Sequence, residues 1–184
     1  MERLFYCDPK EAVFEAARRG DAAFLKEFLE KFYRKDDSIL AVDHYLDYDN
    51  GARPQLKTTP LILAVQSGNL ECVKILLKYK AEIEERGDYI DGYYPCCTPL
   101  FVAAANGNVD ILSFLVESGA DVNARSGDVD EQLTPLMIAC ENGKLNAVLY
   151  LIDEGAEVNL EDSSLNVHIH RPASKGCGCH LSVH

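Results

Sequence analysis

The sequence predicts an all-α fold, an elongated solenoid of stacked helix-turn-helix pairs joined by extended hairpin loops. Two observations predict it. The first is that three segments, residues 59–84, 98–123 and 134–159, align without gaps and each begins with Thr-Pro-Leu. The second is that every copy places a glycine between two short apolar stretches, which is typical of a chain that reverses between two helices.

Each copy begins with a helix start signal. Thr59, Thr98 and Thr134 are placed to accept a hydrogen bond from the first turn, and the proline that follows each has no N–H to leave unsatisfied. The helices that follow carry small residues, which allow neighbouring helices to approach closely. These residues are Ala64, Ala103, Ala104 and Ala139.

Glycine then ends the first helix of each copy, because the reversal requires a positive φ; the three are Gly68, Gly107 and Gly143. The second helices, which contain "VKILL", "VDILSFLV" and "AVLYLI", have apolar residues at helical spacing and so predict a buried stripe. Each copy closes on Gly-Ala, except that the first has Lys80-Ala81.

Residues 8–32 predict a degenerate first unit. Asp8 and Pro9 replace Thr-Pro, Glu11 follows three residues after Asp8, and the helix pair turns at Gly20. We therefore expect one repeat domain over residues 1–165, with this N-terminal cap unit and repeats that start near residues 52, 91 and 128. Residues 166–184 lack the pattern and predict an irregular or disordered tail.

A glycine-reversed helix pair that begins with Thr-Pro and leads into an extended loop resembles the ankyrin repeat, and the resemblance covers residues 52–162. It implies a non-catalytic protein-binding scaffold. The ankyrin consensus has a histidine after Thr-Pro-Leu that links neighbouring repeats, whereas this chain has Ile62, Phe101 and Met137. We therefore expect its stacking to depend more on apolar contacts.

Surplus residues lie between the units. Ankyrin units run about 33 residues, but successive reversal glycines are separated by 48, 39 and 36 positions (Gly20 to Gly68, Gly68 to Gly107, Gly107 to Gly143). Because the helix pairs align without gaps, the additional residues belong to the connecting loops. Such loops project beside the inner helices and form a concave binding surface.

These loops are rich in tyrosine and acid. Tyrosine supplies a large, stiff contact area and carboxylates attract Lys or Arg, so the sequence predicts a groove for a basic peptide or protein tail. The candidate binding residues are Tyr48, Asp88, Tyr89, Asp91, Tyr93, Tyr94, Phe101, Asp128, Asp130 and Glu131. The alternative is that the tyrosines only pack the longer loops and the acids only solvate them.

A narrower resemblance rests on "AVFEAARRG", the long first and second loops, and "AC" before the third reversal. Together these are similar to the N-terminal ankyrin domain of the Fem family of cullin-2 ubiquitin ligase substrate receptors. That resemblance implies capture of the C-terminal tails of proteins, often tails that end near arginine.

Composition limits the partners. The net charge of −12 disfavours nucleic acid and anionic membranes and favours basic proteins. The sequence shows no signal peptide and no apolar run long enough to span a membrane. Seven cysteines in no disulfide pattern indicate a reducing compartment, so we expect a cytoplasmic or nuclear monomer.

No enzyme or cofactor is expected. The chain has no phosphate-binding glycine motif, and His44 is the only histidine outside the tail. Two alternatives to the binding function remain open. The tail contains Cys177, Cys179 and four histidines, so it could bind zinc or copper. The chain could also be a truncated isoform without an independent function.

Overall fold

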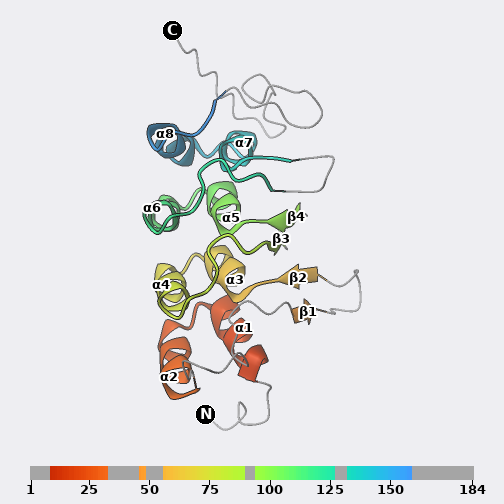
Figure 1. Cartoon of the computed structure of the whole chain (residues 1–184), viewed down its shortest axis with the longest axis vertical. Coiled ribbons are helices and arrows are strands. Elements are labelled where there is room, and N and C mark those ends of the chain that lie inside the picture. Colours follow the sequence, from red (N-terminus) through yellow and green to blue (C-terminus); the bar gives the residue numbers. More distant parts are fainter. Residues whose placement is uncertain (1–8, 33–45, 49–55, 90–93, 127–131, 159–184) are drawn as a thin grey trace.

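The computed structural model describes residues 9–32, 46–48, 56–89, 94–126 and 132–158. These residues form helix pairs stacked in one elongated column, with hairpins that project from one side (Figure 1). The predicted all-α solenoid is confirmed. Asp8, expected to cap the first helix, and the tail at residues 166–184 lie outside the described residues.

Helices α1, α3, α5 and α7 lie above one another beside the hairpins, and α2, α4, α6 and α8 form a second, outer layer (Figure 1). The elements in chain order are α1 (Pro9–Arg19), α2 (Ala22–Phe32), β1 (Leu46–Tyr48), β2 (Leu56–Thr58), α3 (Pro60–Gln66), α4 (Leu70–Lys78), β3 (Gly87–Tyr89), β4 (Tyr94–Cys97), α5 (Pro99–Asn106), α6 (Val109–Glu117), α7 (Pro135–Glu141) and α8 (Leu145–Asp153). Among the described residues, no helix is long and apolar enough to cross a membrane.

The predicted helix caps are present. The Oγ1 atoms of Thr59, Thr98 and Thr134 accept the backbone N–H three residues ahead, at 3.2, 3.3 and 3.3 Å. Extended φ and ψ at these threonines bring the chain into the helix, and proline follows at the first helical position. The sequence signal therefore acts as expected in all three units.

The predicted chain reversals are also present. Gly20, Gly68, Gly107 and Gly143 all have positive φ, between 65° and 74°. At Gly20 a side chain would also meet a neighbour, because an added Cβ would lie 3.2 Å from Cβ of Asn69. Glycine is thus required there both by conformation and by space.

The core runs through the whole stack. The four alanines expected at close helix contacts, Ala64, Ala103, Ala104 and Ala139, have no exposed surface. Ile62, Phe101 and Met137, which occupy the histidine position, are buried as well, in agreement with the expected apolar stacking. The outer helices contribute the stripe expected from their spacing: Cys72, Val73 and Leu76 in α4, Ile111, Leu112 and Leu115 in α6, and Ala147, Val148 and Leu151 in α8.

Polar bonds also join the units, and the sequence analysis did not predict them. Asn142 Nδ2 donates to the carbonyl oxygen of Ala105 at 3.1 Å. The backbone N–H of Asp121 donates to Glu84 Oε1 at 2.8 Å, and the N–H of Glu157 donates to Asn123 Oδ1 at 2.9 Å. Glu84 and Asn123 occupy equivalent positions of two successive units, so the same bond recurs along the stack.

The loops between units are hairpins, as expected from the surplus residues. Leu46 pairs with Thr58 in the first, Gly87 with Cys97 in the second, and Ser126 bridges Leu133 in the third. Their tips, residues 49–55, 90–93 and 127–131, lie outside the described residues.

Candidate protein-binding surface

The β3–β4 hairpin carries most of the predicted binding residues that the structure describes. Asp88 and Tyr89 lie in β3 and Tyr94 begins β4, opposite Tyr89 in the register. For Tyr48 only its place in β1 is described. The other candidates lie outside the described residues and stay predictions: Asp91, Tyr93, Asp128, Asp130 and Glu131.

Tyr89 packs inward. The residue is only 8% exposed, and its hydroxyl donates to Asn106 Oδ1 at 2.6 Å. This bond ties the hairpin to the last turn of α5, since Asn106 is the final residue of that helix. The prediction of Tyr89 as an apolar anchor is corrected, because its ring contacts the stack and its polar tip is already hydrogen-bonded.

The prediction of Phe101 as a contact residue is also corrected. It has no exposed surface, because α5 packs between α3 and α7 and the hairpin covers its start. Its ring meets that of Tyr94 edge to face, with centroids 5.6 Å apart and planes at 67°. Phe101 therefore positions Tyr94, and a partner could reach Tyr94 but not Phe101.

Tyr94 is half-buried, so it combines a supported ring with an accessible part. Edge-to-face aromatic pairs contribute about 0.5–1.5 kcal/mol beyond the area they bury, which restricts the motion of the ring. A side chain that is held in place before binding loses less entropy on binding. Tyr94 is thus the best-supported aromatic anchor among the described candidates.

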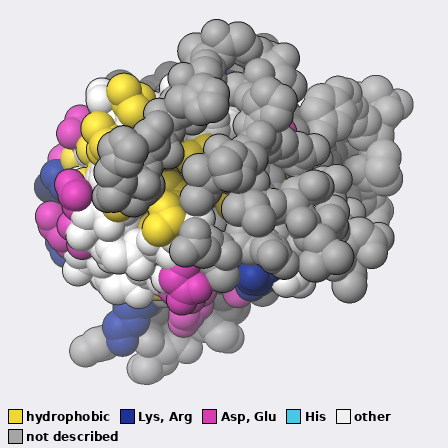
Figure 2. Space-filling model, turned by 90° about the horizontal axis from the view of Figure 1, so that it is seen from above, with side chains coloured by type: hydrophobic (Ala, Val, Ile, Leu, Met, Phe, Trp, Pro, Cys, Tyr) yellow, Lys and Arg dark blue, Asp and Glu magenta, His cyan; other side chains and the backbone are white. Residues whose placement is uncertain are grey.

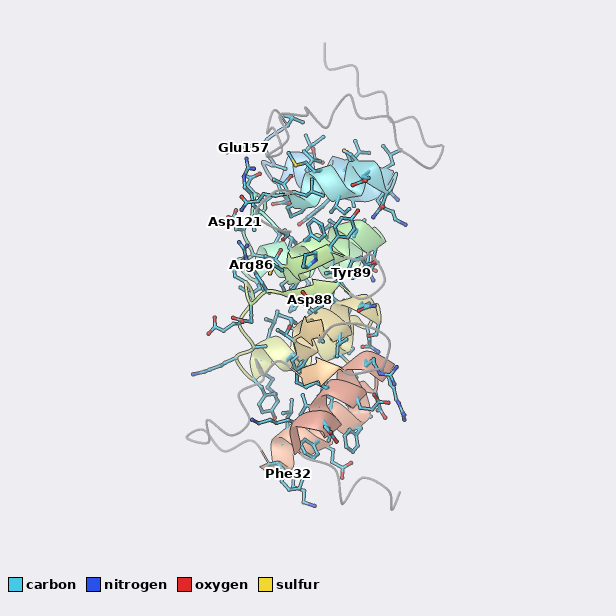
Figure 3. All side chains as sticks on the ribbon, turned by 90° about the vertical axis from the view of Figure 1, so that its right-hand side faces the viewer. Phe32, Arg86, Asp88, Tyr89, Asp121 and Glu157 are labelled. Carbon is cyan, nitrogen blue, oxygen red and sulfur yellow. The ribbon has the colours of Figure 1, made fainter. Side chains whose placement is uncertain are left out.

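Asp88 lies beside it on the same hairpin and is labelled in Figure 3. Its Oδ1 accepts the backbone N–H of Cys96 at 3.3 Å. Cys96 has a φ of 51°, so the hairpin bends there, and the carboxylate of Asp88 stabilises the bend. Asp88 remains partly exposed on the strand that pairs with the one carrying Tyr94.

Two buried cysteines, Cys97 in β4 and Cys72 in α4, have unreactive thiols. Burial, with a smaller contribution from the charge of Asp88, raises the pKa of the Cys97 thiol to about 12, so the thiol stays protonated at neutral pH. Burial likewise raises the pKa of Cys72 to about 11. Within the described ranges no three His, Cys, Asp or Glu side chains come together to hold a metal ion.

Comparison with known families gives the same architecture. The family model for ankyrin repeats (3 copies) matches residues 3–87 and 88–162. The chain belongs to the ankyrin-repeat family. Ankyrin repeats are generally non-catalytic protein–protein interaction modules. A search of the curated proteins found no match.

The ankyrin stack has a second polar region that the sequence analysis missed. It follows the turns after the outer helices, where Asp121 and Glu157 are exposed, and Figure 3 shows them above one another along one edge with Arg86. Glu84 belongs to the same edge through its bond to Asp121. The alignment of the repeats could have predicted this polar region, because Asp121 and Glu157 occupy the same position in successive units.

Proposed function

We propose that this ankyrin-repeat chain binds a basic peptide or a basic protein tail along its hairpin side. The observation that carries the proposal is the arrangement of Tyr94, held edge to face against buried Phe101 with the carboxylate of Asp88 on the neighbouring strand. An aromatic face and a carboxylate together favour Lys or Arg. The net charge of −12 would draw such a partner toward the chain.

The partner class follows from shape and charge together. Hairpins that project beside the inner helices suit an extended segment, which can contact several units at once (Figure 1). If the resemblance to the Fem family extends to function, the bound segment is the tail of a ubiquitin ligase substrate. The stacked surface would then be the substrate-capturing part of that ligase.

Peptide selection on the immobilised full chain tests this proposal. A phage library of protein C-terminal tails is the probe, and selected tails should be enriched in Lys and Arg. With one selected peptide, Tyr94→Ala should weaken binding about tenfold or more, as for a central aromatic anchor. Asp88→Asn should weaken it several-fold, because it keeps the acceptor for the Cys96 N–H but loses the charge.

Two variants on other faces serve as matched controls. Glu71→Gln removes a carboxylate from the outer helix α4, and Phe32→Ala removes an aromatic ring that is 43% exposed at the end of α2. Neither should change peptide affinity, and thermal melts identify any variant that loses its fold. Selection without basic enrichment, or equal losses at Glu71 and Asp88, would contradict the proposal.

A further inference from the structure

The outer helix α8 presents an apolar face. Leu145 is 50% exposed and Leu149 is 48% exposed, and their four-residue spacing places them on the same side of the helix. Figure 2 looks down on this end of the stack and shows hydrophobic side chains gathered there. Apart from Phe32, they are the exposed large hydrophobic residues of the described part of the chain.

The aligned units show what this face is built to contact. Leu70 and Val109 occupy the position of Leu145 in the preceding two units, and both are only partly exposed. In each case another outer helix follows, since α4 contacts α6 and α6 contacts α8. Leu145 is more exposed because no described element follows α8.

The residues aligned with Leu149 in the preceding units give a second comparison. Lys74 occupies it in α4, and its Nζ lies 5.9 Å from the ring centroid of Phe114 in the following unit. A long side chain at this position can therefore reach the following unit, whereas the short Ser113 of α6 donates to the carbonyl oxygen of Asp110 in its own helix. In α8 the residue is leucine, so an apolar covering segment suits it better than solvent.

The chain itself contains a segment of fitting chemistry. Residues 163–184 hold no acid but include Arg171 and Lys175, so this segment has a net charge of +2. The rest of the chain has a net charge of −14, which gives −12 in total. The segment also contains Leu165, Val167 and Ile169 at alternate positions. Asp153 is four residues beyond Leu149 and so continues the same side of α8. Exposed acids end this helix and follow it: Asp153, Glu154 and Glu157.

We propose that residues 163–184 dock on the Leu145–Leu149 face and cap the stack. The apolar residues of the segment cover the two leucines, and its cations lie near the acids that follow. The connection is long enough, because the seven residues from Val158 to Leu165 span up to about 23 Å and α8 is only about 13 Å long. A second copy of the chain is a poorer occupant, since it would bring the same acids together.

Limited trypsin digestion of the full chain tests the proposal. Lys175–Gly176 is the cleavable bond of the segment, because Arg171 precedes a proline and no Lys or Arg lies between Lys144 and Arg171. In the wild type, docking should protect this bond. The double variant Leu145→Gln/Leu149→Gln adds no trypsin site, and it should raise the initial rate of cleavage at least fivefold, as read by mass spectrometry.

Phe32→Gln is the matched control, because Phe32 is a comparably exposed apolar residue at the opposite end of the stack. It should leave the cleavage rate unchanged, and circular dichroism should show folded helices in all three proteins. Equal cleavage rates in the wild type and the double variant would overturn the proposal. A wild-type dimer in sedimentation that the double variant dissociates would also overturn it, because a second copy would then cover the face.

Discussion

Asn69 binds the backbone of the preceding unit at Gly20, where its Nδ2 donates to the carbonyl oxygen at 2.8 Å. The same side chain caps α4, since its Oδ1 accepts the N–H of Cys72 at 3.0 Å. One amide thus starts a helix and fixes the N-terminal unit to the first full repeat. Gly20 makes this possible because a Cβ there would press against Asn69.

Replacing Asn69 by alanine should therefore remove two bonds. We expect Asn69→Ala to lower the free energy of unfolding by about 2 kcal/mol, the sum of about 1 kcal/mol for a lost helix cap and about 1 kcal/mol for a lost internal hydrogen bond. Asn108→Ala is the matched control, because Asn108 caps α6 through the N–H of Ile111. Urea denaturation measures both, and an equal loss in the two variants would show that the bond to Gly20 adds nothing.

The sequence predicted the local features of the fold well, because each depends on a few neighbouring residues. A Thr-Pro pair needs only its own helix turn to form a cap, and the reversal at Gly68 needs only a residue that tolerates positive φ. The link between Asn69 and Gly20 could not be predicted in this way. It joins residues 49 positions apart and depends on how two units stack.

The candidate surface shows the same limit. The surplus residues of the second loop correctly indicated a hairpin, but its sequence could not show which rings face the stack. Tyr89 and Tyr94 face each other in the register, yet Tyr89 is 8% exposed and hydrogen-bonded to Asn106, while Tyr94 rests on Phe101 and remains partly accessible. The two rings pack against different residues of α5, Asn106 and Phe101, and the sequence of the loop does not specify these contacts.

Lys144 occupies the position that Asn69 and Asn108 hold in the other units, and it makes no side-chain cap to α8. Lys144→Asn should raise the free energy of unfolding by about 0.5–1 kcal/mol, because asparagine is among the best N-cap residues. Lys144→Ala is the control, because it removes the lysine stem, which lies where a Cβ on Gly107 would sit, without adding a cap. If the asparagine variant is no more stable than the alanine variant in urea, a side-chain cap does not stabilise α8 and the prediction is wrong.

Lys80 adopts a left-handed conformation, with φ of 67°, at the position held by Gly119 and Gly155 in the next two units. A side chain with a Cβ is strained there, so Lys80→Gly should stabilise the chain by about 1 kcal/mol. Lys80→Ala keeps the Cβ and should gain little. Thermal unfolding of the two variants at the same pH compares them, and a gain in the alanine variant alone would contradict the backbone explanation.

Glu84 places a carboxylate where the next unit has Asn123, and both accept a backbone N–H from the following unit. Although Glu84 is largely exposed, its Oε1 lies against the backbone of Asp121, and desolvation there raises the pKa of Glu84 above its ordinary value of 4.5; the charge of Asp121 adds to this. A carboxyl group with a raised pKa binds its proton more tightly in the folded chain. The contribution of Glu84 to stability is therefore greatest at acidic pH and falls as the pH rises from the ordinary range of Glu through the raised pKa.

Glu84→Gln keeps an oxygen acceptor for the N–H of Asp121 and removes the charge. At pH 7 the variant should melt at the same temperature as the wild type or above it, and this difference should shrink as the pH falls toward 4.5, where the wild-type carboxyl group gains its proton. Melting curves of both proteins between pH 4 and pH 8 measure the difference directly, since other titrating groups act equally in each. A variant that melts well below the wild type at pH 7 would mean that the charged acceptor strengthens the bond to Asp121 by more than its desolvation costs.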